Sequence, residues 1–167
     1  MSGIIGQDLQ VKSGLFGFPA GHVLQTKIKS LETTNDGSNY ISTNVTTGAV
    51  ATFAGSNLEI TGFSATSGNH LFMTYNGLSH TGDSPNHNGI LGFIVDGTKY
   101  STSLFSGAGT SPMSPQLAIT LSSDLSNATI SAMIGAPNSS TKYGYIHDYA
   151  SLYPHTVCSL IVMEIQA

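Results

Sequence analysis

Histidine and aspartate are the side chains of this chain that come closest to a metal-binding pattern. Of its six histidines, His80 and His87 share one polar stretch with Asp83, and this spacing could wrap a divalent cation. The stretch offers no further strong ligand and no supporting second shell, which protein metal sites need. We therefore expect solvated loop residues there and no bound metal. A separate metal site could form only if His147 or His155 met its copies from other subunits on a symmetry axis.

Catalytic patterns are missing from the sequence. Cys158 lies in an apolar run, where a buried and inert thiol is expected. Glu32, Glu59 and Glu164 are too dispersed to nominate a pair of glycosidase carboxylates. The chain contains neither a Gly-x-Ser-x-Gly nucleophile motif nor a glycine-rich phosphate loop that opens a helix. We expect a protein that is not an enzyme and that uses no cofactor.

Tyrosines gather near the C-terminus, at Tyr143, Tyr145, Tyr149 and Tyr153. Tyrosine is favoured at protein interfaces, and an exposed tyrosine beside Asn or Asp can also stack on a sugar ring. Packing within a strand or loop is a third interpretation. We assign Tyr149 and Tyr153 to a subunit interface.

Composition excludes several partners. Only 8% of the 167 residues are charged, and the five basic residues are all lysine; about 25% is usual. Without arginine or a basic run, nucleic acid is not expected as a partner. No apolar run approaches the roughly 20 residues of a membrane span, and no signal peptide is visible. The single cysteine excludes an intramolecular disulfide.

Alternating apolar residues predict an all-β fold, because helical periodicity is absent while strand signals recur at the spacing of a sandwich or barrel. The Asp96-Gly97 pair predicts a type I′ hairpin turn. The predicted strands are Val23–Ser30, Tyr40–Val45, Leu58–Ser64, His70–Ser79, Ile90–Val95, Lys99–Phe105, Gln116–Ser122, Thr129–Ile134, Lys142–Ile146 and Thr156–Ile165.

The strand Thr156–Ile165 is apolar on both faces. An exposed antiparallel strand normally alternates apolar with polar side chains, so this strand should be covered twice. One cover is its own core, and the simplest second cover is another copy of the chain. We therefore predict an oligomer and assign Cys158, Leu160 and Val162 to its subunit interface.

Long loops and an irregular beginning mark candidate contact surfaces. The stretches Ser79–Asn88 and Ser106–Pro115 are polar or rich in Gly and Pro, and loops of this length usually contact something. From them we take His80, Asp83, His87, Pro112 and Met113 as candidate receptor or surface residues.

We divide the chain into an N-terminal arm, residues 1–21, and one β domain, residues 22–167. The arm holds Leu15, Phe16 and Phe18 among several glycines. We assign these three side chains to attachment on the surface of another protein, although a frayed terminus would have the same composition.

Three segments together suggest a family. They are Ser13–Gln25 (SGLFGFPAGHVLQ), Leu58–Thr66 (LEITGFSAT) with the apolar strand that starts at Leu71, and Ser159–Ile165 (SLIVMEI). In this order they resemble the tumour-necrosis-factor-like jelly-roll proteins and fibre-tip domains of tailed bacteriophages. The resemblance implies an antiparallel two-sheet jelly-roll sandwich, a homotrimer, and display on a virion surface.

The resemblance leaves two roles. A short arm without a long shaft favours a capsid decoration or cement protein, which would be bound to the major capsid protein or another virion protein and assembled in the bacterial cytoplasm. The alternative is a receptor-binding tail fibre or tip that recognises host surface polysaccharide. A soluble carbohydrate-binding module unrelated to any virus is a more remote alternative.

Overall fold

The computed structural model describes residues 20–34, 41–45, 50–52, 58–80, 88–106, 110–135, 142–146 and 155–167. Its strands are β1 (Val23–Thr34), β2 (Ile41–Val45), β3 (Val50–Thr52), β4 (Glu59–Ala65), β5 (His70–His80), β6 (Asn88–Val95), β7 (Thr98–Ser106), β8 (Thr110–Met113), β9 (Gln116–Thr120), β10 (Leu125–Gly135), β11 (Lys142–Ile146) and β12 (His155–Ile165).

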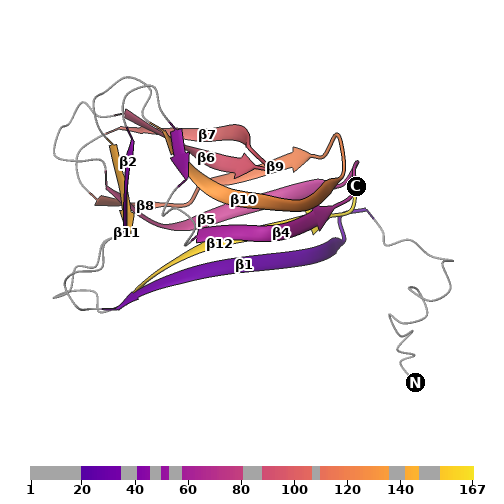
Figure 1. Ribbon diagram of the computed structural model, residues 1–167, viewed down its shortest axis with the longest axis horizontal. Coiled ribbons are helices and arrows are strands. Elements are labelled where there is room, and N and C mark those ends of the chain that lie inside the picture. The colour runs from indigo at the N-terminus through magenta and orange to yellow at the C-terminus, as the bar shows by residue number, and fades with distance from the viewer. Residues whose placement is uncertain are drawn as a thin grey trace, which may run out of the picture.

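These strands form a two-sheet jelly roll. The first sheet has the order β1-β12-β5, with β8 and β9 both paired to β5, and the second has the order β3-β10-β6-β7, with β4 paired to β10. Every pairing is antiparallel. Strands distant in sequence, such as β1 and β12, lie side by side, as two Greek keys require. Figure 1 shows the two layers, with the small β2–β11 sheet at one end. The predicted all-β sandwich is confirmed.

Each predicted strand overlaps an observed one, and two short strands were not predicted. The missed strands are β3 and β8. Pro112 and Met113 belong to β8 and pair with Leu78 and Gly77, and His80 ends β5 opposite Thr110. The assignment of Pro112, Met113 and His80 to loops is therefore corrected. Strand β8 pairs on one side with β5, and proline is tolerated at such an edge.

The predicted hairpin at Asp96-Gly97 is confirmed. Both residues have positive φ, 47° and 81°, as a type I′ turn requires. Val95 pairs with Thr98 across the turn, which joins β6 to β7.

The core lies between the sheets and is built by the inward side chains of both. Its largest fully buried members are Tyr75, Phe63, Phe93, Leu58, Leu71, Met73, Ile130, Ile134 and Leu160. In β5, Leu71, Met73 and Tyr75 point inward at every second residue, as the pleat dictates.

Gly77 makes room for the buried Tyr75 side chain. A Cβ at position 77 would meet the Tyr75 hydroxyl and would lie 2.8 Å from the Cys158 sulfur. Burial raises the pKa of the Tyr75 hydroxyl, and the neighbouring Cys158 adds to this. The phenol is therefore neutral, and the aromatic ring extends along its own strand into the space that the missing side chain leaves.

We predict that Gly77→Ala destabilises the sandwich by about 1–3 kcal/mol, because the added methyl overpacks a filled space. Chemical denaturation monitored by tyrosine fluorescence measures this. The double variant Gly77→Ala/Tyr75→Phe removes the closest clashing atom and should recover part of the loss. Equal stability of Gly77→Ala and the wild-type chain would contradict the packing described here.

Candidate functional site

Strand β12 presents two different faces, and its inner face belongs to the chain's own core. Cys158, Leu160 and Val162 are each 0% exposed and pack with the residues of the second sheet. Their assignment to a subunit interface is corrected, because side chains buried inside one sandwich have no surface left for a partner. The alternate residues Ser159, Ile161 and Met163 are only partly buried. Any contact of β12 side chains with another molecule would use this outer face.

The outer face continues across the neighbouring strands. Directly paired residues of antiparallel strands place their side chains on the same face. Ile161 pairs with Ile28 on one side and with Thr74 on the other, and Met163 pairs with Thr26 and Phe72. Phe72 in turn pairs with Ala118. We call Ile28, Phe72, Ala118, Ile161 and Met163 the outer patch.

The outer patch is open to solvent and framed by small polar side chains. Ile28 is 61% exposed, the highest value among the large apolar residues that the structure describes as exposed. Phe72, Ile161 and Met163 are half-buried. The frame consists of Thr26, Ser30, Asn76, Gln116, Thr120 and Ser159.

Both lysines of β1 lie on the opposite, inner side. Lys27 pairs with Val162 and Lys29 with Leu160, so both lysines share the side of those buried residues. The Lys27 ammonium donates a hydrogen bond to the Gly62 carbonyl at 2.5 Å and lies 5.6 Å from the centre of the Phe63 ring. One carboxylate residue, Glu32, lies on the outer face opposite Val157, near the end of β1, whereas the described residues of the outer patch and its frame include no Lys, Asp or Glu.

Glu164 is the charged residue that β12 buries. It is 5% exposed, and its carboxylate accepts hydrogen bonds from the Asn69 side chain at 2.7 Å and from the Thr66 backbone N–H at 2.9 Å. The Gln25 side chain donates to the second carboxylate oxygen at 2.7 Å and to the Ser64 carbonyl at 2.5 Å. The group therefore ties β1, β12 and the β4–β5 turn together.

The hydrogen bonds decide the charge of Glu164. Burial by itself would raise the pKa of this carboxyl, but the donors from Thr66, Asn69 and Gln25 outweigh burial and leave the pKa below its usual value. The residue is ionised at neutral pH. Its role is structural, because both carboxylate oxygens accept hydrogen bonds from the protein.

Several predicted site residues lie outside the described residues. These are Leu15, Phe16, Phe18, Asp83, His87, Tyr149 and Tyr153. Within the described part of the chain, no three His, Cys, Asp or Glu side chains come together as ligands of a metal ion would. The same part contains no helical segment fit to span a membrane.

Comparisons with known proteins agree in architecture only. No family model and no curated protein sequence matches the chain. Among solved structures, it resembles the T=1 particles derived from infectious bursal virus, at 15% identity and a TM-score of 0.40, over 86% of this chain and 41% of that chain. The chain thus spans less than half the length of that viral chain.

Two further structures are similar over nearly their full length. Murine APRIL matches at 9% identity and a TM-score of 0.33, over 74% of this chain and 98% of that chain. A Bacillus endospore appendage protein matches at 10% identity and a TM-score of 0.29, over 91% of this chain and 98% of that chain. At such low similarity, the jelly roll is established by the chain's own strand order.

We predict that Glu164→Gln lowers the free energy of unfolding at pH 7 by about 1–3 kcal/mol, because an amide cannot accept all the donors that the carboxylate accepts. The depressed pKa adds a pH dependence. The stabilisation is complete above the unfolded-state pKa of about 4.3 and is lost as pH falls through the lower folded-state pKa.

Urea denaturation from pH 7 to pH 3 checks this prediction. The difference between the wild-type chain and Glu164→Gln should shrink below about pH 4. Glu59→Gln is the matched control, because Glu59 accepts no hydrogen bond from a described residue. If the difference in unfolding free energy between the wild-type chain and Glu164→Gln stays constant across this range, Glu164 does not stabilise the fold as a carboxylate.

Proposed function

We propose that the chain is a non-enzymatic structural protein of a bacteriophage virion, a homotrimeric jelly roll that decorates the capsid and stabilises the head. One observation supports this above the others. On the outer face of the first sheet, the outer patch and its frame combine exposed apolar side chains with an absence of Lys, Asp and Glu, and Glu32 is the one acidic residue that the register places on this face, near the end of β1. A face that remains in water would normally carry Lys, Glu or Asp, whereas a face that meets its own copies avoids like charges.

The outer patch suits a second copy of the same chain. Symmetric packing brings identical residues close together, so charges of one sign would repel, while Ile28, Ile161 and Phe72 can bury area and the framing hydroxyls and amides can hydrogen-bond across. Fully burying such a side chain contributes about 1.5–3 kcal/mol, and those already half-buried contribute less. The trimeric state itself is inferred from the resemblance to the phage jelly-roll proteins.

Attachment to the major capsid protein is assigned to the arm that precedes β1. The backbone N–H of Gly21 donates to the Gln166 carbonyl at 2.7 Å, and that of Gln166 donates to the His22 carbonyl at 2.9 Å. These bonds fix the start of the domain against its C-terminus. Leu15, Phe16 and Phe18 lie just before this anchored point in the sequence, and three arms per trimer would add their binding energies by avidity.

We predict that the double variant Ile28→Glu/Ile161→Glu turns the oligomer into a folded monomer, because it places unpaired carboxylates in the centre of the subunit contact. Both side chains point away from the core of the chain, so the fold should survive. Size-exclusion chromatography with light scattering measures the mass, and circular dichroism checks the fold.

Ser101→Glu is the matched control for this variant. Ser101 is an exposed strand residue of β7, in the second sheet, so the same charge there should leave the mass unchanged. An Ile28→Glu/Ile161→Glu chain that keeps the wild-type oligomeric mass would contradict the assignment of the outer face.

A second prediction concerns the arm. Deletion of residues 1–19 should leave the oligomer folded, because the hydrogen bonds that close the domain begin at Gly21. The truncated protein should no longer bind capsids, and cosedimentation with particles that lack the protein tests this. Normal occupancy of the particles by the truncated chain would show that attachment lies elsewhere.

Copy number distinguishes decoration from the alternative role at the tail. Quantitative mass spectrometry of purified particles should find the chain in the hundreds of copies that a decorated capsid requires. A handful of copies per particle would contradict decoration and favour a receptor-binding tail protein.

A further inference from the structure

The two lateral seams of the sandwich differ. At the seam between β1 and β4, Lys27 and Gln25 reach from one sheet to the backbone carbonyls of Gly62 and Ser64 in the other. At the opposite seam, β7 of the second sheet faces β9 of the first, and a depression of about 200 Å³ lies between them. The depression is lined from both sheets, including Leu125 at the start of β10, and from the segment 121–124 that joins β9 to β10.

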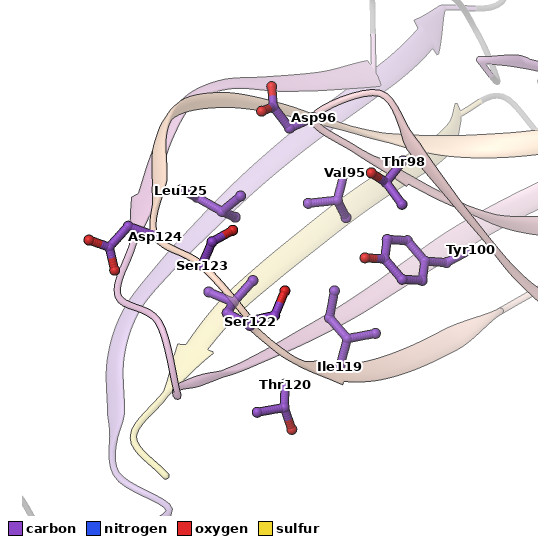
Figure 2. A pocket seen from close by; sticks show the side chains of 11 residues that line it. Val95, Asp96, Thr98, Tyr100, Ile119, Thr120, Ser122, Ser123, Asp124 and Leu125 are labelled. Carbon is purple, nitrogen blue, oxygen red and sulfur yellow. The ribbon is translucent and has the colours of Figure 1, made fainter.

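Inner-face side chains form the walls of this seam depression. Tyr100 pairs with the buried Phe93 and therefore faces inward, and Ile119 pairs with the buried Leu71. Figure 2 shows the Tyr100 ring with Val95, Ile119 and Leu125 around the hollow, and the Tyr100 hydroxyl directed toward its middle. The inner wall thus contains apolar and aromatic side chains and one phenol group, while the solvent-accessible lining as a whole is mostly polar.

The rim is polar and acidic. The hydroxyl residues Thr98, Ser122 and Ser123 border the depression, and the carboxylates of Asp96 and Asp124 lie at its outer margin. All five residues are exposed. No lysine, arginine or histidine is among the lining residues, so an anionic ligand would meet carboxylates without any compensating cation.

Hydrogen bonds hold both sides of the depression in place. On one side, the Asp96 backbone N–H donates to the Thr129 carbonyl at 2.9 Å. On the other, Asp124 accepts a hydrogen bond from the Ser67 backbone N–H at 2.7 Å, and the Leu121 backbone donates to the Asn69 carbonyl at 2.9 Å. A site held in this way needs little ordering when a ligand enters.

Gly92 sets the position of Tyr100. The β6–β7 register shifts between Leu91 and Gly92, and a Cβ on Gly92 would meet the Tyr100 carbonyl oxygen and lie 2.9 Å from the Met133 methyl carbon. The glycine thus permits the close approach that places the aromatic ring at the seam.

We propose that the seam depression binds a single neutral sugar ring. A pyranose has an apolar C–H face that can stack on the Tyr100 ring, and hydroxyl groups that can donate to the Asp96 carboxylate and exchange hydrogen bonds with Ser122 and Ser123. The Asp96 carboxylate makes no hydrogen bond to a described residue and is available as an acceptor. The volume lies below the roughly 300–1,000 Å³ of drug-sized ligand sites, which limits the occupant to one ring.

This site is distinct from the predicted receptor loops. The seam depression adjoins the end of β6, the start of β7 and the end of β9, whereas those loops follow the end of β5 and the end of β7. The antiparallel pairing of β6 with β7 places the two ends of β7 far apart along the sandwich. The inference is also independent of the capsid role.

Saturation-transfer NMR on the full chain at pH 7 tests the proposal, with the methyl glycosides of glucose, galactose, mannose and N-acetylglucosamine as probes. At least one probe should receive saturation and should titrate with a Kd in the millimolar range, as expected of a shallow site for one ring. Tyr100→Ala should weaken that binding at least about tenfold, and Asp96→Asn should weaken it less.

Two further variants keep the test decisive if Tyr100→Ala fails to fold. Ser122→Phe fills the mouth of the depression from an exposed position and should abolish binding, while Ser101→Ala, on the opposite face of β7, should leave it unchanged. Absence of transfer to all four probes, or equal transfer in the wild-type and Ser122→Phe chains, would overturn the proposal. Tighter binding of methylamine than of any sugar would also overturn it, in favour of a cation site. The oligomeric mass of the same samples reports separately on the proposed structural role.

Discussion

Strand β12 imposes the constraint on which this structure depends, because it is an interior strand of the first sheet and carries apolar side chains on both faces. Its inner side chains, Cys158, Leu160 and Val162, are completely buried by the second sheet. At the end of the same face, Gln25, Thr66 and Asn69 donate hydrogen bonds to Glu164 and hold its pKa below the usual value. The inner face is thus satisfied within one chain, and the demand for a second cover falls on the outer face alone.

The sequence predicted the fold well because alternation is a local property of a strand. The pleat, the Asp96-Gly97 turn and the absence of helical periodicity required no knowledge of neighbours. Strands β3 and β8 escaped prediction because they are short, and β8 lies among Gly and Pro residues, so its pairing with β5 is decided by the sheet. Pattern alone also could not say which apolar face of β12 would meet the core.

The sequence placed a candidate interface on β12, but on residues that the structure puts in the core. The doubly apolar strand pointed to an interface, yet Cys158, Leu160 and Val162 turned out to be core. Ile28 and Phe72 complete the outer face, and only the register of β1 and β5 against β12 brings them beside Ile161 and Met163. A sequence signal existed in β1, where lysines at positions 27 and 29 alternate with threonine, isoleucine and serine. This alternation identifies the outer face only after the register shows that both lysines lie on the inner side. The seam depression had no sequence signal, because Tyr100 and Ile119 meet only across the two sheets.

The most direct test of this account is sedimentation equilibrium of the wild-type chain at micromolar concentration. Burial of the outer face by sister subunits predicts an oligomer, and the trimer that the family resemblance implies would be a single species of three times the 17.4 kDa chain mass. A well-behaved species of 17.4 kDa would leave the outer patch in water and contradict the central claim.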